Sequence, residues 1–188
     1  MGKLSHKVNV NSLVNFLINF NRWLQAYREH GIKFWGMTVQ NEPMTGFNKG
    51  FSWNTMGFTA EMERDFVKTD LGPALEKAGW GTDKFNLMVM DDNRELLPDW
   101  AHVVLGDKNA AKYIKGVGVH WYGNAIAGPD RLDQTPHKFP NHFILATEAC
   151  EAKFDSPINA ERVSLGNWNF GQTYAHDIIK DLTHWSIG

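Results

Sequence analysis

The sequence of 188 residues contains a single cysteine, Cys150, so no disulfide can form within the chain. Cysteine usage therefore does not distinguish an oxidising from a reducing compartment. A long apolar run is also lacking, because Asn15 and Asn19 interrupt the apolar stretch at residues 13–20. Its apolar side chains repeat at helical spacing, which predicts an amphipathic helix rather than a signal-peptide core or a membrane span.

An excess of charge of either sign is lacking as well. The formal net charge is −2 and the basic residues are scattered, which argues against a nucleic-acid partner and against a polybasic membrane patch. Aromatic residues are plentiful by comparison, with 8 Trp, 12 Phe and 4 Tyr. Such side chains most often fill a core, but their flat faces also stack on sugar rings or lipid chains. We therefore expect a ligand that is neutral or held by something other than overall charge.

Four short apolar segments alternate with helical patterns, and each segment stops at polar or ionisable residues. The predicted strands are residues 32–39 before Gln40-Asn41-Glu42-Pro43, 85–90 before Asp91-Asp92-Asn93-Arg94, 117–119 before His120-Trp121-Tyr122, and 143–146 before Thr147-Glu148. The first predicted helix runs from a cap at Asn11 or Ser12 to about His30, and the second begins at Thr59 with Glu61 and Glu63 in its first turn. Two short helices are predicted at 100–105 and 110–114. A last helix near the end carries Tyr174, Ile178, Ile179 and Leu182 on one face. This order is typical of consecutive βα units of a parallel barrel.

The predicted fold class is therefore α/β, as part of a (β/α)₈ TIM barrel. A whole barrel has eight strands and about 250 residues, whereas four strands are visible in this sequence. We expect residues 1–188 to form a single, partial catalytic domain that supplies roughly strands 4 to 7 of such a barrel.

Glu42 and Glu148 end the first and the last of these strands, so they should face each other across one rim. Two carboxylates about 5–5.5 Å apart are the machinery of retaining glycoside hydrolysis, in which one protonates the departing oxygen and the other attacks the anomeric carbon. A lone strand-end carboxylate is more often a solvated or ion-paired group, so the pairing carries this hypothesis. Asn41 can donate to a sugar 2-hydroxyl, and Trp35 is expected as an apolar neighbour of the acid.

Longer stretches of the sequence resemble one family. FWGMTVQNEP, MGFTAEMERDF, LGPAL, MDDNRELLPDWAHVVL, AAKYIKGVGVHWY and TEAC occur in the order and approximate spacing of the glucosylceramidases of glycoside hydrolase family 30. The resemblance covers nearly all of the chain after its first few residues. It implies the general acid/base at Glu42, the nucleophile at Glu148, the 2-hydroxyl partner at Asn41, and pocket residues at His120 and Tyr122.

The same resemblance implies further contacts and a setting. It places Phe51 and Trp53 at the mouth of a glucose pocket, although core packing is an equal alternative for both. Asn93 stands where the mammalian enzyme of that family has Gln, so sugar or aglycone contacts there can differ. The implied reaction is hydrolysis of glucosylceramide to glucose and ceramide by double displacement, without a metal or organic cofactor. The implied setting is lysosomal, with an anionic lipid surface and a saposin-type activator as partners.

Other interpretations stay open from the sequence. A family member could cleave another β-glycoside, such as a β-xyloside or a β-1,6-glucan. A truncated homologue could instead be a non-catalytic glycan- or glycolipid-binding module, because half a barrel exposes two sheet edges and apolar surface.

Two smaller alternatives concern single side chains. Asp91, Asp92, His120 and Glu148 could form an oxygen-and-imidazole metal site. Adjacent residues of a strand point to opposite faces, so we expect at most one of the two aspartates in the pocket, with an ion pair to Arg94 as the simpler role. Cys150 is expected to be a buried, inert thiol.

Overall fold

The computed structural model describes residues 10–151 and 165–184. Its first element, α1 (Val10–Glu29), begins before the predicted caps Asn11 and Ser12, which therefore lie inside the helix. The predicted stop at Gly31 is confirmed. Gly31 has a φ of 81°, its N–H donates to the carbonyl of Arg28, and the next N–H, that of Ile32, donates to the carbonyl of Tyr27. A left-handed residue closing a helix in this way is the common role of glycine.

The four predicted strands are present and form one parallel sheet. They are β1 (Gly36–Thr38), β2 (Asn86–Asn93), β3 (Gly116–His120) and β4 (Phe143–Glu148), in the order β1-β2-β3-β4. β1 is shorter than expected, because its ladder with β2 begins only at the pair Gly36 and Asn86. Consecutive strands that pair in parallel require a crossover after each strand, which is the arrangement of half a (β/α)₈ barrel.

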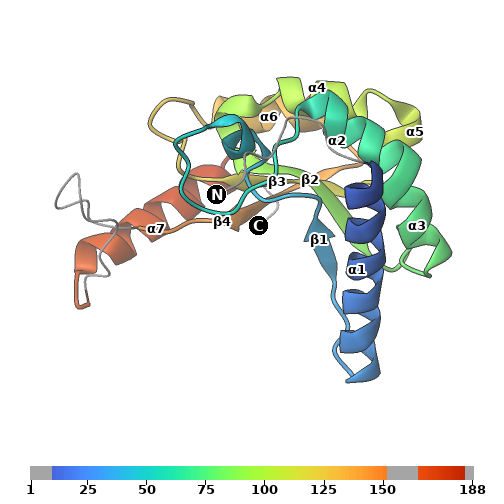
Figure 1. Cartoon of the computed structure of the whole chain (residues 1–188). Helices are drawn as coiled ribbons and strands as arrows, with labels where there is room; N and C mark the ends of the chain where they lie inside the picture. The colour runs from blue at the N-terminus through green and yellow to red at the C-terminus, as the bar shows by residue number, and fades with distance from the viewer. Residues whose placement is uncertain (1–9, 152–164, 185–188) are drawn as a thin grey trace.

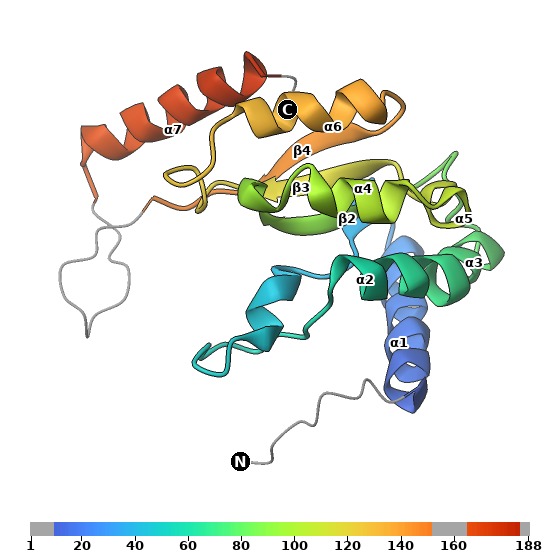
Figure 2. The same cartoon turned by 90° about the horizontal axis from the view of Figure 1, so that it is seen from above.

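The helices lie mainly on one face of this sheet. The remaining elements are η1 (Pro43–Phe47), α2 (Ala60–Phe66), the π-helical turn Val67–Leu71, α3 (Gly72–Lys77), η3 (Arg94–Leu96), α4 (Asp99–Leu105), α5 (Lys108–Ala111), α6 (Asp130–Lys138) and α7 (Trp168–Leu182). Figures 1 and 2 show α2, α4 and α6 side by side over the sheet, while α1 extends away beside β1. The opposite face of the sheet corresponds to the inside of the barrel.

The helical layer and the sheet enclose the hydrophobic core. Phe66 of α2, Val104 of α4, Val89 of β2 and Val117 of β3 are all buried in it. α7 forms as predicted, but its apolar side chains are not covered by the described residues, since Ile178, Ile179 and Leu182 are 57%, 64% and 54% exposed. Among residues 10–151 and 165–184, no helix combines the length and apolar character needed to cross a membrane.

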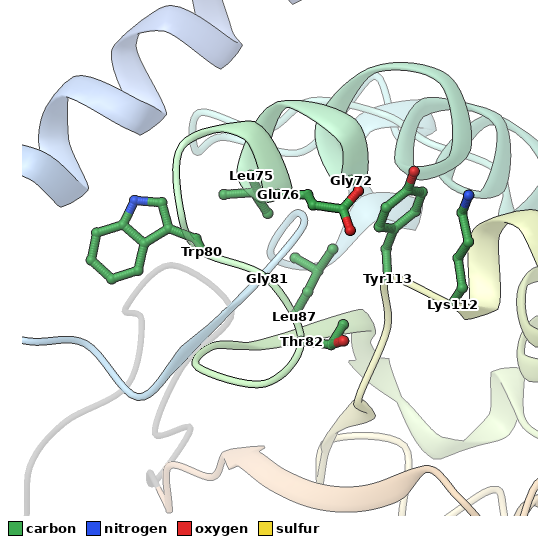
Figure 3. A pocket seen from close by; sticks show the side chains of 9 residues that line it. All are labelled: Gly72, Leu75, Glu76, Trp80, Gly81, Thr82, Leu87, Lys112 and Tyr113. Atoms are coloured by element: carbon green, nitrogen blue, oxygen red, sulfur yellow. The ribbon is translucent and has the colours of Figure 1, made fainter.

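A small cavity lies at the far end of the strands from their polar residues. It measures about 20 Å³ and is lined by Gly72, Leu75, Glu76, Trp80, Gly81, Thr82, Leu87, Lys112 and Tyr113. Figure 3 shows these side chains around the start of β2, with Tyr113 close to Gly72. A space of this size holds about one water molecule, so we assign it no ligand.

Candidate active site

The polar strand ends converge on His120, the last residue of β3. One carboxylate oxygen of Glu42, one ring nitrogen of His120 and one carboxylate oxygen of Glu148 all lie within 4.8 Å of one another. His120 Nδ1 is 3.2 Å from Glu42 Oε1, and His120 Nε2 is 3.8 Å from Glu148 Oε2. The structure thus brings together both carboxylates that the sequence singled out, with a buried imidazole between them.

A bulge in β2 supplies a third carboxylate to this cluster. Met90 and Asp91 have positive φ values of 70° and 52°, and the register passes from Met90 opposite Gly118 to Asp92 opposite Val119, which leaves Asp91 as the extra residue. A bulge of this kind breaks the alternation of side chains along a strand.

The bulge directs the carboxylate of Asp91 toward the site. Asp91 Oδ1 accepts from Thr147 Oγ1 at 2.6 Å and lies 3.2 Å from His120 Nε2, while Asp91 Oδ2 accepts from Thr38 Oγ1 at 2.6 Å. Asp92 is also buried and accepts from the backbone N–H of Met44 at 3.2 Å. Asp91 thus contacts the site histidine, whereas Asp92 is held by the backbone N–H of Met44 in η1.

Glu42 sits on a tight turn that the same bulge supports. Its φ is 42°, and its N–H donates to the carbonyl of Asp91 at 2.8 Å. Its own carbonyl accepts from both the N–H and the hydroxyl of Thr45, at 3.0 and 2.6 Å. Pro43 follows as the buried first residue of η1. The backbone of the acid is thus fixed on both sides of its Cα.

Trp35 does not neighbour this acid as expected. It lies before the start of β1, at the opposite end of the strand, where its ring is 59% exposed and packs 5.5 Å from the ring of Phe143. The expectation failed because Trp35 comes seven residues before Glu42, and an extended segment of that length spans about 23 Å.

The electrostatics of the cluster favour a protonated His120. Burial lowers the pKa of this imidazole, but Asp91, Glu148 and Glu42 together raise it by more, so the pKa lies above its ordinary value. Asp91 behaves in the complementary way. Burial raises the pKa of its carboxyl, while hydrogen bonds from His120, Thr147 and Thr38 together bring it below the ordinary value. The imidazolium can therefore offset the negative charges that the carboxylates concentrate here.

Tyr122 contacts Glu148 directly. Its hydroxyl donates to Glu148 Oε1 at 2.9 Å. Burial, followed by this hydrogen bond and the negative charge of Glu148, raises the pKa of the tyrosine above its ordinary value, so the phenol stays protonated as a donor. Tyr122 therefore fixes the rotation of the Glu148 carboxylate.

The remaining predicted site residues lie at the edge of the cluster. Asn41 is exposed at the end of β1. Asn93 Oδ1 accepts from Gly123 N at 2.9 Å, so this side chain orders the loop after β3. Phe51 and Trp53 pack edge to face with centroids 6.0 Å apart in the loop before α2, and Trp53 is 70% exposed. The structure thus leaves the ring of Trp53 available at the surface, as a ligand contact would need.

Two minor expectations were wrong. Arg94 does not pair with Asp91 or Asp92, because its buried guanidinium forms an ion pair with Asp181 of α7 at 2.9 Å. Cys150 is exposed rather than buried, since the chain leaves the sheet after Glu148.

Glu63 is the buried group whose role sequence reasoning missed. The sequence identified it only as an acid in the first turn of a helix, but its carboxylate is fully buried and accepts from Trp100 Nε1 at 2.6 Å. Burial raises its pKa to about 7. The available signal was its spacing of three residues from both Ala60 and Phe66, which places it on the apolar side of the helix.

The donor set of the cluster suits proton sharing better than a metal ion. Glu42, His120 and Glu148 could each offer one ligand atom within 4.8 Å of the others. However, Nδ1 of His120 is directed at Glu42 and Nε2 at Asp91, each at 3.2 Å, so neither ring nitrogen is left for a metal.

A hollow of about 410 Å³ opens beside Tyr122. It lies between the loop after β3 and α7, and its lining includes Trp121, Tyr122, Cys150, Thr173, His176 and Lys180. Trp121 is held in place by stacking on Tyr174 of α7, with centroids 4.9 Å apart and an interplanar angle of 13°. The hollow therefore adjoins the tyrosine that contacts Glu148.

Comparison with known proteins gives consistent matches. The model of the glycosyl hydrolase family 30 TIM-barrel domain matches residues 2–188. The chain is 45% identical over 171 residues to putative glucosylceramidase 3 of Caenorhabditis elegans, covering 90% of this chain and 31% of that protein. It is 41% identical over 170 residues to the lysosomal acid glucosylceramidase of Mus musculus, covering 90% of this chain and 32% of that protein.

A solved structure shares the fold. The crystal structure of SrfJ from Salmonella typhimurium superposes with a TM-score of 0.79 at 23% identity, over 96% of this chain and 37% of that one. The chain thus spans about a third of the length of the curated relatives that it matches.

Proposed function

Because the chain belongs to glycosyl hydrolase family 30, we propose that it carries the catalytic centre of a retaining β-glucosidase, within one partial barrel domain formed by residues 1–188. The observation that carries the proposal is the close approach of Glu42 and Glu148 at the ends of β1 and β4, with carboxylate oxygens within 4.8 Å. Retaining enzymes hold their two carboxyl groups about 5–5.5 Å apart, whereas inverting enzymes need about 6.5–9.5 Å to admit a water. The spacing favours the retaining mechanism.

In the first step, a carboxylate oxygen of Glu148 attacks the anomeric carbon while the bond to the leaving oxygen breaks. Glu42 donates its proton to that oxygen, so the alcohol leaves neutral and a glycosyl ester on Glu148 remains. In the second step, Glu42 removes a proton from a water whose oxygen attacks the anomeric carbon, and the ester bond breaks. Both carboxyl groups return to their initial protonation states.

The neighbours of the pair serve these steps. Tyr122 donates to Glu148 Oε1 and so orients the nucleophile, while His120 lies between the two carboxylates and offsets their charge. We assign sugar or aglycone contacts to Asn41, Phe51, Trp53 and Asn93, with Asn41 donating to the sugar 2-hydroxyl. Asn41, Phe51 and Trp53 lie between β1 and α2, and Asn93 is the last residue of β2.

The proposed substrate is glucosylceramide, cleaved to glucose and ceramide. It is supported by 41–45% identity to relatives named as glucosylceramidases, one of them lysosomal. We accordingly propose a lysosomal setting, an anionic lipid surface as the place of contact with substrate, and a saposin-type activator as partner. These partners suit a chain with a net charge of only −2, which does not itself repel an anionic surface strongly.

Covalent labelling tests this proposal. The chain is incubated with a cyclitol epoxide related to β-glucose, its intact mass is measured, and the adduct is located by peptide mapping. We expect one adduct, on Glu148, and none in Glu148→Gln, because the amide cannot act as the nucleophile. Glu151→Gln is the matched control, three residues further on, and should label like the parent chain. Labelling that persists in Glu148→Gln would refute the assignment of the nucleophile.

A further inference from the structure

Glu63 is an acidic side chain in the core whose hydrogen-bond partners, Trp100 and Met90, have no part in the proposed mechanism. It lies on α2, on the helix-covered side of the sheet, and is 0% exposed. Its carboxylate accepts three contacts: Trp100 Nε1 at 2.6 Å, and the N–H of Met90 at 3.2 and 3.3 Å to its two oxygens. A buried carboxylate is costly, so a position of this kind needs a reason beyond packing.

The N–H of Met90 belongs to the first residue of the β2 bulge. Met90 and Asp91 both have positive φ, a conformation that costs of order 1–3 kcal/mol for a residue with a side chain and persists only where the surroundings fix it. A bulge also removes backbone groups from the regular ladder, and a buried N–H without a partner costs about 1–3 kcal/mol. Glu63 accepts that N–H and so removes this penalty.

The bulge in turn positions the cluster of Glu42, Asp91 and His120, which lies on the other side of the sheet. The carbonyl of Asp91 accepts from the N–H of Glu42, and the Asp91 carboxylate contacts His120, Thr147 and Thr38. A regular strand would turn the side chain of Asp91 to a different face and move its carbonyl. The acid of the proposed mechanism therefore depends, through one strand, on a carboxylate that it does not touch.

We propose that Glu63 is a positioning residue for the active site, holding the Met90–Asp91 bulge that places Glu42 and His120. This inference rests on the proposed function for its catalytic meaning, but its structural content is independent of activity. It differs from the simpler role of Glu63 as an anchor between α2 and α4, in which loss of the carboxylate would loosen that helical layer alone.

Amide hydrogen exchange, resolved by residue, separates the two roles. The variants are Glu63→Gln, which keeps the volume and one acceptor oxygen, and Glu63→Leu, which keeps neither acceptor. Val104→Ala is the control, since Val104 is buried on α4 and has no hydrogen-bonding side chain. The amides followed are those of Met90 and Glu42, with that of buried Val117 in β3 as the reporter of global opening.

We expect exchange at Met90 and Glu42 to become about tenfold faster relative to Val117 in Glu63→Gln, or ~1.4 kcal/mol of local opening free energy. Glu63→Leu should accelerate exchange at these two amides further. If Glu63→Leu does not fold, the result with Glu63→Gln alone tests the proposal. Val104→Ala should change all three amides together. Unchanged exchange at Glu42 in folded Glu63→Gln would overturn the proposal.

Labelling of Glu148 by the cyclitol epoxide is the second readout. We expect Glu63→Gln to slow labelling about tenfold, and Val104→Ala to leave it within twofold. If the parent chain is not labelled at all, the proposed function fails, while hydrogen exchange still decides whether Glu63 holds the bulge.

Discussion

The contact between Tyr122 and Glu148 offers the most direct probe of a single residue. Tyr122→Phe removes the hydroxyl that donates to Glu148 Oε1 at 2.9 Å and leaves the ring in place. A hydrogen bond to a charged group contributes about 1.5–3 kcal/mol, which corresponds to a rate of labelling at Glu148 lower by about 10- to 100-fold. The measurement is the second-order rate of inactivation by the cyclitol epoxide.

Stability should respond much less, because Tyr122 is 42% exposed. Tyr113→Phe provides the control, since Tyr113 lines the small cavity at the opposite end of the strands and its hydroxyl is far from Glu148. If Tyr122→Phe labels as fast as Tyr113→Phe, the tyrosine does not orient the nucleophile.

For single residues, the sequence predicted a role where a reactive side chain lies directly at the end of a predicted strand. Glu42 and Glu148 could be paired because parallel strands deliver their carboxyl ends to one edge. The part played by Asp91 could not be predicted, since it depends on two positive φ values that an unbroken pattern of alternation does not reveal. Glu63 escaped notice for a different reason: a first-turn acid normally faces solvent, and its spacing from Ala60 and Phe66 was outweighed by its charge, although its partners Trp100 and Met90 are buried.

Among the elements, β3 and the bulge of β2 approach each other closely at the site. A Cβ added at Gly118 would lie 2.9 Å from Asp91 Oδ1 and 3.0 Å from Thr147 Oγ1. Gly118→Ala should therefore push apart the hydrogen bond between these two side chains. We expect it to destabilise the fold by about 1–3 kcal/mol, as overpacking commonly does, measured by urea denaturation.

Gly171→Ala is the matched control for this prediction. Gly171 lies inside α7, and a Cβ there would meet nothing within 4 Å. Alanine at such a helix position stabilises by about 0.5–1 kcal/mol relative to glycine, so the two substitutions should have opposite signs. A stabilising Gly118→Ala would show that β2 can retreat from β3 without cost.

The elements themselves were easier to predict than their limits. All four strands follow from short apolar segments, but β1 is shortened because only three of its residues pair with β2. α6 was missed because Pro136 lies inside it and its sequence is polar, whereas prolines usually end helices. α1 begins earlier than its candidate caps, which shows that a capping residue type inside a helical pattern does not by itself fix the boundary.

For the whole molecule, the class of fold followed from the alternation of strands and helices, because each strand needs a crossover to reach its parallel neighbour. Which helices are buried and which are exposed could not be predicted from that alternation. Apolar residues of α7 repeat at helical spacing as if buried, yet they face solvent among the described residues. Periodicity identifies an apolar face but not the partner that covers it, and the curated relatives are about three times as long as this chain.

Stability as a function of pH tests the electrostatics of the whole fold. The native state raises the pKa of Glu63 to about 7 and also raises the pKa values of Asp92 and His120. Each of these groups binds its proton more tightly when folded than when unfolded, so each favours the folded state at low pH and loses that contribution as pH rises. The lowered pKa of buried His142 acts in the opposite direction. We expect the free energy of unfolding to fall between pH 5 and about 7.5, measured by urea denaturation at each pH.

Glu63 should account for much of that slope. A rise in its pKa from the ordinary value of 4.5 to about 7 contributes ~3 kcal/mol to the free energy of unfolding at low pH. This contribution is lost progressively as pH increases from 4.5 to about 7, and above that window the effect of Glu63 no longer changes with pH. Glu63→Gln removes this titration and should flatten the curve, whereas Glu61→Gln, on the exposed side of the same turn, should leave the curve parallel to that of the parent chain. If the parent chain instead became more stable as pH rises from 5 to about 7, the raised pKa of Glu63 would be wrong.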